Sequence, residues 1–166
     1  MTGLILFLSL LLLCLNGVFA QERALQFQQK LTHFAPGTAV STFSQRYYVD
    51  ETHKDPSKHI YVLYICNESP CVGIPNDYVR VYAQELGAGM VALEHRFYGE
   101  SVPGNNLSTE NMKQHLNVRE VLGDLAWFRE WFQANHLGGT PHKWILAGCS
   151  YGGALSAWTR LKYPHL

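Results

Sequence analysis

Charged residues are scarce in this chain of 166 residues, and neither sign prevails. Asp, Glu, Lys and Arg make up only 16% of it, and 13 basic residues balance 13 acidic ones, so the formal net charge is zero. The chain therefore lacks the basic field that would hold nucleic acid or an anionic membrane surface. Collagen-like periods, heptad runs, low-complexity tracts and repeats are also missing. The rest is 47% hydrophobic and 13% aromatic, which is typical of one folded domain or part of a larger one.

The one long apolar run lies at the amino end, from Leu4 to Ala20, and no Lys or Arg precedes it. Small residues stand before Gln21, where the sequence turns polar. We interpret residues 1–20 as a cleaved secretory signal peptide. An uncleaved anchor is the alternative, because about 18 apolar residues can just span a bilayer. Residues 21–166 would then form the mature domain.

Secretion would place the remaining cysteines in an oxidising compartment, where disulfides persist. Cys66 and Cys71 are near enough in sequence to close a short loop, which leaves Cys149 unpaired within the chain. Because Cys149 follows an apolar run, we expect it to be a buried free thiol. Two glycosylation sequons begin at Asn67 and Asn106, and the Gly- and Asn-rich loop around Asn106 favours that residue as the acceptor.

Three apolar runs typical of strands buried on both faces alternate with three helical patterns, which predicts an α/β fold with a mostly parallel sheet covered by helices on both faces. The runs are His59–Ile65, Met90–Leu93 and Trp144–Ala147. The helices are expected from a cap at Asn76 to about Leu86, from about Asn117 to before Gly138, and from Gly152 to about Tyr163. The first helix would bury an apolar face of Tyr78, Val79, Tyr82, Ala83 and Leu86. A further short strand is expected at Gln45–Val49, irregular chain at 21–44 and a loop at 97–110.

The third apolar run leads into Gly148-Cys149-Ser150-Tyr151-Gly152, a G-x-S-x-G motif between a strand and a helix. This context is typical of a nucleophile elbow, in which a strained turn exposes the serine hydroxyl. Ser150 is therefore the candidate nucleophile, and the Tyr151 N–H is a candidate oxyanion donor. The alternative is an ordinary glycine-rich turn with a solvated serine.

A second oxyanion donor is expected in the loop Cys66–Cys71, which follows an earlier buried strand; Asn67 is the candidate, and a simple connection is the alternative. The segment after Met90–Leu93 is rich in ionisable and aromatic groups. Glu94 and Arg96 need partners, either each other or groups across the sheet. We expect a scaffold for the elbow, or the wall of its cleft, to be formed by Glu68, Glu94, His95, Arg96 and Tyr98.

A catalytic triad needs a histidine and an acid besides the serine, and in α/β-hydrolases both follow it. After Ser150 the sequence contains no Asp or Glu, and its only histidine is His165. A helix would carry His165 about 20 Å from Ser150. His95, His115, His136 and His142 precede the serine. The chain as given is therefore expected to lack a complete catalytic set.

Four stretches together resemble the secreted and lysosomal serine peptidase family that includes prolyl carboxypeptidase, dipeptidyl peptidase II and thymus-specific serine peptidase. They are QKLTHF (29–34), SQRYYVD (44–50), ALEHRFYGES (92–101) and GCSYGGALSAWTRLKYPHL (148–166). The resemblance implies an α/β-hydrolase fold with a helical cap domain, the nucleophile at Ser150 and an oxyanion donor at Tyr151. A Gly-Gly-Glu-Gly-Pro loop is usual in the family; here Glu68 and Pro70 are kept in Cys66-Asn67-Glu68-Ser69-Pro70.

The resemblance also implies that this is the N-terminal portion of a longer enzyme, with the cap domain and C-terminal part missing. The expected function of the full-length form is serine-type exopeptidase cleavage of peptides after a proline near one terminus, in a secreted or lysosomal location. We expect no metal, no cofactor, no nucleic acid and no membrane after signal cleavage; a homodimer of the full-length form is left open. The alternatives are a lipase or esterase, or a non-catalytic truncated product. An exposed apolar strand edge would make the recombinant 166-residue form insoluble or inactive.

Overall fold

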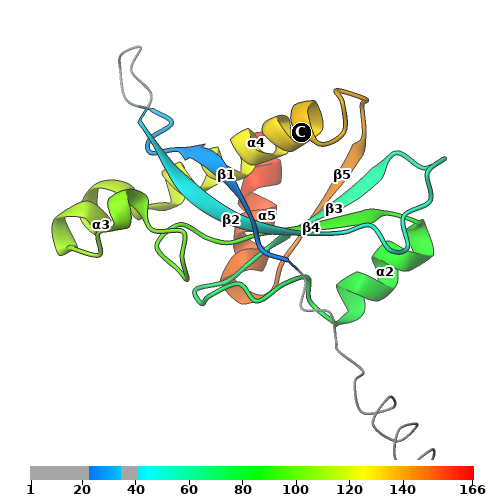
Figure 1. The fold of residues 1–166 in the computed structure, drawn as a ribbon, viewed down its shortest axis with the longest axis horizontal. Helices are drawn as coiled ribbons and strands as arrows, with labels where there is room; N and C mark the ends of the chain where they lie inside the picture. Colours follow the sequence, from blue (N-terminus) through cyan, green and yellow to red (C-terminus); the bar gives the residue numbers. More distant parts are fainter. Residues whose placement is uncertain (1–22, 35–40) are drawn as a thin grey trace, which may run out of the picture.

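The protein forms a five-stranded sheet with helices on both faces (Figure 1). The structure is a computed structural model and describes residues 23–34 and 41–166; the expected signal peptide lies outside the described residues. The strands are β1 (Leu25–Lys30), β2 (Thr42–Asp50), β3 (Ile60–Ile65), β4 (Gly89–Leu93) and β5 (Lys143–Ala147). The helices are α2 (Tyr78–Leu86), α3 (Thr109–His115), α4 (Val118–Asn135) and α5 (Ser150–Lys162), with a short 3₁₀ turn, η1 (Pro103–Asn105).

The strands lie in the order β1-β2-β4-β3-β5, and the sheet is mixed rather than mostly parallel. The three apolar runs form the parallel part, in which β3 pairs with β4 on one side and with β5 on the other. On the far side of β4, strands β2 and β1 add two antiparallel pairings. The expectation of irregular chain before residue 44 was wrong at β1. This strand is rich in glutamine and is stabilised by its pairing with β2, which composition alone does not reveal.

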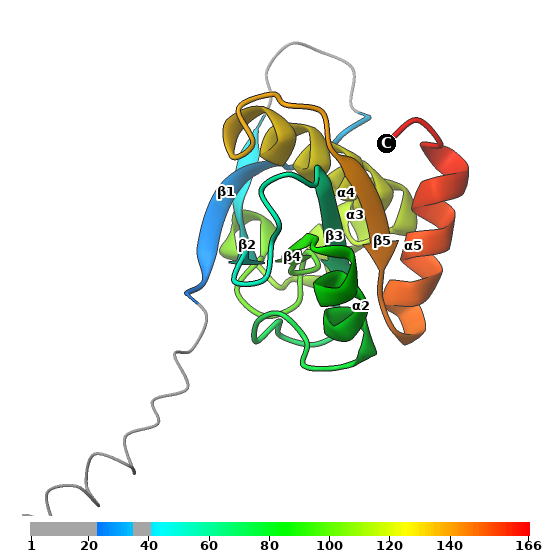
Figure 2. The same cartoon turned by 90° about the vertical axis from the view of Figure 1, so that its right-hand side faces the viewer.

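The two faces of the sheet carry separate apolar cores. On one face, Phe128 and Phe132 of α4 and Leu155 of α5 pack against Tyr61 and Leu63 of β3. On the other face a smaller cluster joins Val62, Met90 and Ala83 of α2. Figure 2 shows the sheet edge-on, with α5 beside β5. The predicted α/β arrangement with helices on both faces is confirmed. Because β3, β4 and β5 are parallel, their carboxyl ends lie at the same end of the sheet.

Helix α4 follows the expected pattern, with Asn117 as its N-cap and buried apolar residues at three- and four-residue steps. Helix α2 differs in two ways. Its N-cap is Asp77, whose Oδ1 accepts the Val79 N–H at 2.8 Å, and not Asn76. Its predicted apolar face is also wrong, because only Ala83 is buried, while Tyr78 is 79% exposed and Tyr82 is 65% exposed. Periodicity identifies an apolar stripe, but it does not tell which elements cover it.

Helix α3 lies partly in the segment 97–110, where only a loop was expected, and its N-cap is Ser108. None of its residues is buried, so it carries no hydrophobic period that a pattern could detect. At the other end of the molecule, β5 forms one edge of the sheet within the described residues. Its Ile145 is 40% exposed, which is the exposed apolar edge that the sequence predicted. The insolubility expected from this edge stays a prediction.

Candidate active site

Ser150 lies in the sharp turn between β5 and α5. Cys149 is the N-cap of α5, and Ser150 is the first helical residue, two positions before the expected start. The φ angle of Ser150 is +50°, in the left-handed region that L-residues avoid at a cost of about 1 kcal/mol. A non-glycine residue holds this conformation only where its surroundings enforce it. The backbone therefore has the strained form of a nucleophile elbow.

The glycines of the motif are required by close contact. A Cβ atom on Gly148 would lie 2.4 Å from the carbonyl carbon of Gly152. A Cβ atom on Gly152 would lie 2.4 Å from the carbonyl oxygen of Ile65, at the end of β3. Any larger residue would separate strand from helix at the point where the serine is presented, so the sequence G-x-S-x-G follows from packing.

The loop between Cys66 and Cys71 lies directly against this elbow. The side-chain oxygen of Asn67 accepts the Gly152 N–H at 3.0 Å. Cys66 and Cys71 form a disulfide with a Cα–Cα distance of 5.8 Å. The Tyr151 N–H lies in the first turn of α5, where no intrahelical acceptor exists. The structure thus brings together the two segments from which the sequence predicted oxyanion donors.

Cys149 is exposed, so the expectation of a buried thiol was wrong. The reason is the position of β5: it is an edge strand, and its end is only partly covered within the described residues. Asn106, the favoured glycosylation acceptor, is exposed after η1, where its side chain accepts the Ser108 N–H at 2.8 Å.

Glu94 and Arg96 do not pair with each other. Glu94 binds Arg46 of the neighbouring strand β2, and Arg96 binds Asp124 of α4. The guanidinium of Arg96 donates to both carboxylate oxygens of Asp124, from Nε and from Nη2, each at 2.6 Å. Both Glu94 and Arg96 are completely buried, and such ions are found only with partners. Each is therefore paired across the fold, and its role as a scaffold for the elbow stays a prediction.

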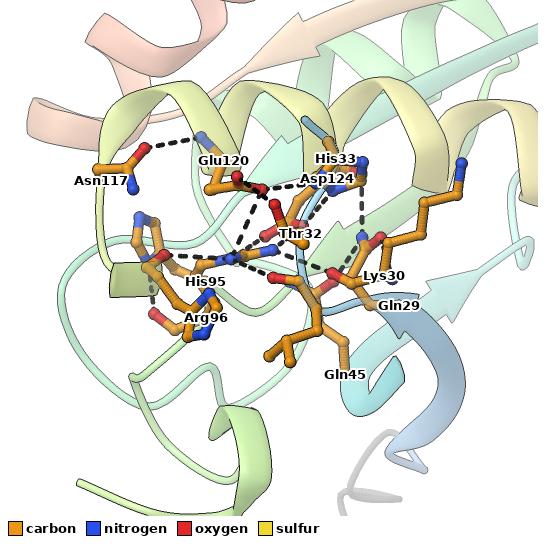
Figure 3. A network of polar contacts seen from close by, with 12 residues as sticks. Gln29, Lys30, Thr32, His33, Gln45, His95, Arg96, Asn117, Glu120 and Asp124 are labelled. Carbon is orange, nitrogen blue, oxygen red and sulfur yellow. Dashed lines mark hydrogen bonds and ion pairs between the residues drawn. The ribbon is translucent and has the colours of Figure 1, made fainter. Parts of the chain in front are cut away.

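A network of polar contacts around Arg96 joins α4 to the chain after β1 (Figure 3). Asp124 also contacts His33 Nε2 at 2.8 Å, and Glu120 accepts the Thr32 hydroxyl at 2.8 Å. Arg96 Nη1 donates to the Leu31 carbonyl at 3.1 Å. Sequence reasoning missed these partners. Their signal is the placement of two acids, Glu120 and Asp124, one turn apart beside the apolar stripe of α4.

His95 lies between the scaffold and the elbow. Its Nδ1 is 2.7 Å from the Arg96 carbonyl oxygen, so this nitrogen carries the proton and donates it. Its ring is 5.0 Å from that of Tyr98 and 5.5 Å from that of Tyr151, between centroids. Burial lowers the pKa of His95 below its ordinary value, because the charged imidazolium loses its hydration there. Burial likewise raises the pKa of the Tyr151 phenol.

Glu68 is exposed in the loop beside the elbow, and Tyr98 is half-buried. His165 lies beyond the end of α5, where its ring contacts that of Tyr163, so the helix separates it from Ser150. In the part of the chain that the structure describes, no group of three or more His, Cys, Asp or Glu side chains could hold a metal ion. None of the described helices is long and apolar enough to cross a membrane.

The sheet topology, the covering helices and the strained turn at Ser150 are those of a partial α/β-hydrolase fold. Solved structures support this fold: a probable hydrolytic enzyme of Pseudomonas aeruginosa PAO1 has a TM-score of 0.52, with 14% identity over 89% of this chain and 40% of its own. Homoserine O-acetyltransferase of Staphylococcus aureus has a TM-score of 0.50, with 13% identity over 85% of this chain and 42% of its own.

The chain belongs to the serine carboxypeptidase S28 family, whose profile matches residues 29–166. It is 45% identical to the probable serine protease EDA2 of Arabidopsis thaliana, over 86% of this chain and 30% of that protein. It is 37% identical to the human lysosomal Pro-X carboxypeptidase, over 92% of this chain and 31% of that enzyme. Identity to the mouse thymus-specific serine protease is 35%, over 75% of this chain and 25% of that protein. The chain thus spans about 30% of the length of these relatives.

Proposed function

We propose that this chain supplies the nucleophile and the oxyanion hole of a secreted or lysosomal serine exopeptidase. One observation carries the proposal: Ser150 occupies a strained turn at φ +50° inside the stretch that matches the S28 family. The names of the lysosomal Pro-X carboxypeptidase relatives support peptides with a proline near one end as substrates, and support a lysosomal location.

In this mechanism, the Ser150 hydroxyl attacks the carbonyl carbon of the proline residue, which the scissile bond joins to the nitrogen of the next residue. The new bond joins Oγ to that carbon, and the carbonyl π electrons move onto its oxygen. The N–H groups of Tyr151 and Asn67 donate to this oxyanion, and the Tyr151 N–H gains from the positive end of α5. A general base takes the hydroxyl proton and delivers it to the amide nitrogen as the C–N bond breaks and the amine leaves. A water molecule, deprotonated by the same base, then attacks the acyl-enzyme ester, and the ester oxygen returns to Ser150 with the proton as the acid is released. The mechanism assigns the role of base to a histidine of the full-length enzyme, in the α/β-hydrolase order.

The test uses the protein at its natural length, expressed from its own message and treated with a fluorophosphonate probe. Ser150→Ala should abolish labelling. Ser57→Ala changes an exposed turn that is distant from Ser150 in the sequence, and should leave labelling unchanged. Peptides with proline before the last residue, and others with proline second from the amino end, are then offered as substrates. Turnover of either set that is lost in Ser150→Ala supports the proposal. Turnover of simple esters alone favours the esterase alternative, and no labelling of the wild type contradicts a catalytic role.

A further inference from the structure

Glu94 is completely buried at the end of β4, and its carboxylate accepts hydrogen bonds from six donors. Arg46 donates to Oε1 from both Nε and Nη2. The turn after β4 supplies three donors to Oε2: the Glu100 N–H at 3.1 Å, the Ser101 N–H at 3.1 Å and the Ser101 hydroxyl at 2.6 Å. The sixth donor is the Cys71 N–H, 2.9 Å from Oε1. Glu94 therefore joins a rigid turn to the far end of the loop Cys66–Cys71.

Cys71 is fixed on three sides. Its N–H is held by Glu94, its carbonyl accepts the Tyr48 hydroxyl at 2.8 Å, and its sulfur is bonded to Cys66. At the near end of the loop, the Cys66 N–H donates to the Leu93 carbonyl at 3.1 Å. Between these anchors lies Asn67, whose side chain reaches the Gly152 N–H. The loop that carries Asn67 is thus anchored at both ends, at Cys66 and at Cys71, and Glu94 supplies one of the anchors at Cys71.

From this arrangement we infer that Glu94 is a positioning residue for the oxyanion hole. It holds the Cys71 N–H and thereby helps to fix the loop that carries Asn67, whose Oδ1 accepts the Gly152 N–H next to Tyr151, without touching the substrate. The inference rests on the proposed function, because the oxyanion hole has a role only if Ser150 is acylated. A misplacement of about 1 Å in such a group can slow the chemical step by about 100-fold.

The chemistry of the site requires a carboxylate. All six contacts are donors, so an amide at this position would place an NH₂ group against N–H or O–H groups. Space is equally restricted, because a Cβ atom on Gly99 would lie 2.0 Å from Glu94 Oε1. The turn therefore closes tightly around the carboxylate, and Glu94→Gln preserves the shape of the side chain while it removes the match between acceptors and donors.

The experiment compares Glu94→Gln with Asp124→Asn in the protein at its natural length. Both variants remove a buried carboxylate that binds an arginine, but the Asp124 carboxylate binds Arg96 and His33, whereas the Glu94 carboxylate binds the Cys71 N–H of the loop Cys66–Cys71. Each variant is measured for kcat and KM on the proline peptide, for inhibition by a peptide boronic acid that mimics the tetrahedral state, and for amide hydrogen exchange in residues 66–71.

We expect Glu94→Gln to lower kcat by at least about tenfold, while KM changes less than about twofold. The affinity for the boronic acid should fall by a factor similar to that for kcat. Exchange in residues 66–71 should rise in this variant and not in Asp124→Asn. Equal losses of kcat in the two variants, or unchanged exchange at Cys71, would overturn the inference. If Glu94→Gln does not fold, Glu94→Asp keeps the charge, shortens the arm and is held to the same criteria.

The two proposals can fail separately. If the wild type shows no Ser150-dependent turnover, the proposed function fails, and the assignment of an oxyanion role to this loop fails with it. The hydrogen-exchange measurement still decides whether Glu94 holds Cys71. If turnover is present and only the kcat difference is missing, the proposed function stands and Glu94 is merely structural.

Discussion

Replacing Gly152 by alanine tests whether close contact at the elbow outweighs the higher helix propensity of alanine. A Cβ atom at this position would lie 2.4 Å from the Ile65 carbonyl oxygen and 2.8 Å from Asn67 Oδ1. Ordinary contact begins at 3.4 Å, so the first distance is 1.0 Å too short (3.4 minus 2.4). The first neighbour is the backbone of β3, and the second is the end of the Asn67 side chain, which the Gly152 N–H holds at 3.0 Å.

Two opposing effects set the expected stability. Alanine is favoured over glycine in a helix by about 1 kcal/mol. Overpacking at a tight contact costs about 1–3 kcal/mol. The free energy of unfolding of Gly152→Ala should therefore fall by no more than about 2 kcal/mol, and the variant should fold. The activity should respond much more strongly, because the end of β3 must move by about 1.0 Å and Asn67 Oδ1 by about 0.6 Å (3.4 minus 2.8), which is expected to lower kcat/KM by about 100-fold.

Gly153→Ala is the matched control in the next position of the same helix. Its Cβ would lie 3.1 Å from the Gly148 carbonyl oxygen, only 0.3 Å inside ordinary contact (3.4 minus 3.1). This variant should keep kcat/KM within about threefold of the wild type, because a shift of a few tenths of an ångström absorbs the contact. Urea unfolding gives the stabilities, and turnover of the proline peptide gives kcat/KM. If the two variants are equally active, the argument that close contact with Ile65 and Asn67 requires glycine at position 152 is refuted.

Three further predictions concern the elbow, the core and pH. Ser150→Gly should unfold with a free energy about 1 kcal/mol higher than Ser150→Ala, because glycine adopts φ +50° without strain; equal values in urea unfolding would show that the turn is not strained. Phe128→Ala should cost about 3–5 kcal/mol in the same assay, since its ring is completely buried among Phe27, Tyr47 and Phe132, and a loss below about 1 kcal/mol would contradict that packing. His95→Asn tests the buried imidazole. Burial lowers its pKa in the fold, so the unfolded chain takes up a proton first as the pH falls below 6.5, and the wild type loses stability in that window. The Tm of the variant should therefore fall less between about pH 7.5 and about pH 5 than the Tm of the wild type. Equal falls would show that other groups cause the loss of stability.

The sequence was informative where local chemistry and packing coincide. The three apolar runs became the parallel strands β3, β4 and β5, because residues that are buried on both faces leave a continuous apolar signal. The elbow was predictable for a similar reason: close approach of strand and helix permits only glycine at Gly148 and Gly152. Helix α4 was visible through its period and its Asn117 cap.

The sequence was less informative where the partner of a residue decides its structure. β1 is a strand because it pairs with β2, although its own residues alternate weakly. The partners of Arg96 and Glu94 lie 28 and 48 residues away, at Asp124 and Arg46, and no local pattern links such distant ions. Tyr78 and Tyr82 were assigned to a buried face because their spacing is helical, yet exposure is a property of what packs over a helix.

The loop Cys66–Cys71 lacks the glycines that are usual at this place in the family, yet other contacts hold it in place. Glycines in such a loop are indispensable only where φ is positive or where another group approaches too closely for a Cβ. The described non-glycine residues with positive φ are Phe97, Asn105 and Ser150, so no residue of this loop needs the freedom of glycine. Its order comes from elsewhere: the disulfide, the Tyr48 hydroxyl and the Glu94 carboxylate fix Cys71, and the Asn67 amide fixes the other end to α5. Anchored in this way, a loop whose residues carry side chains can hold an N–H in place as firmly as a tightly turned glycine loop. Release of any one anchor should therefore affect turnover before it affects folding.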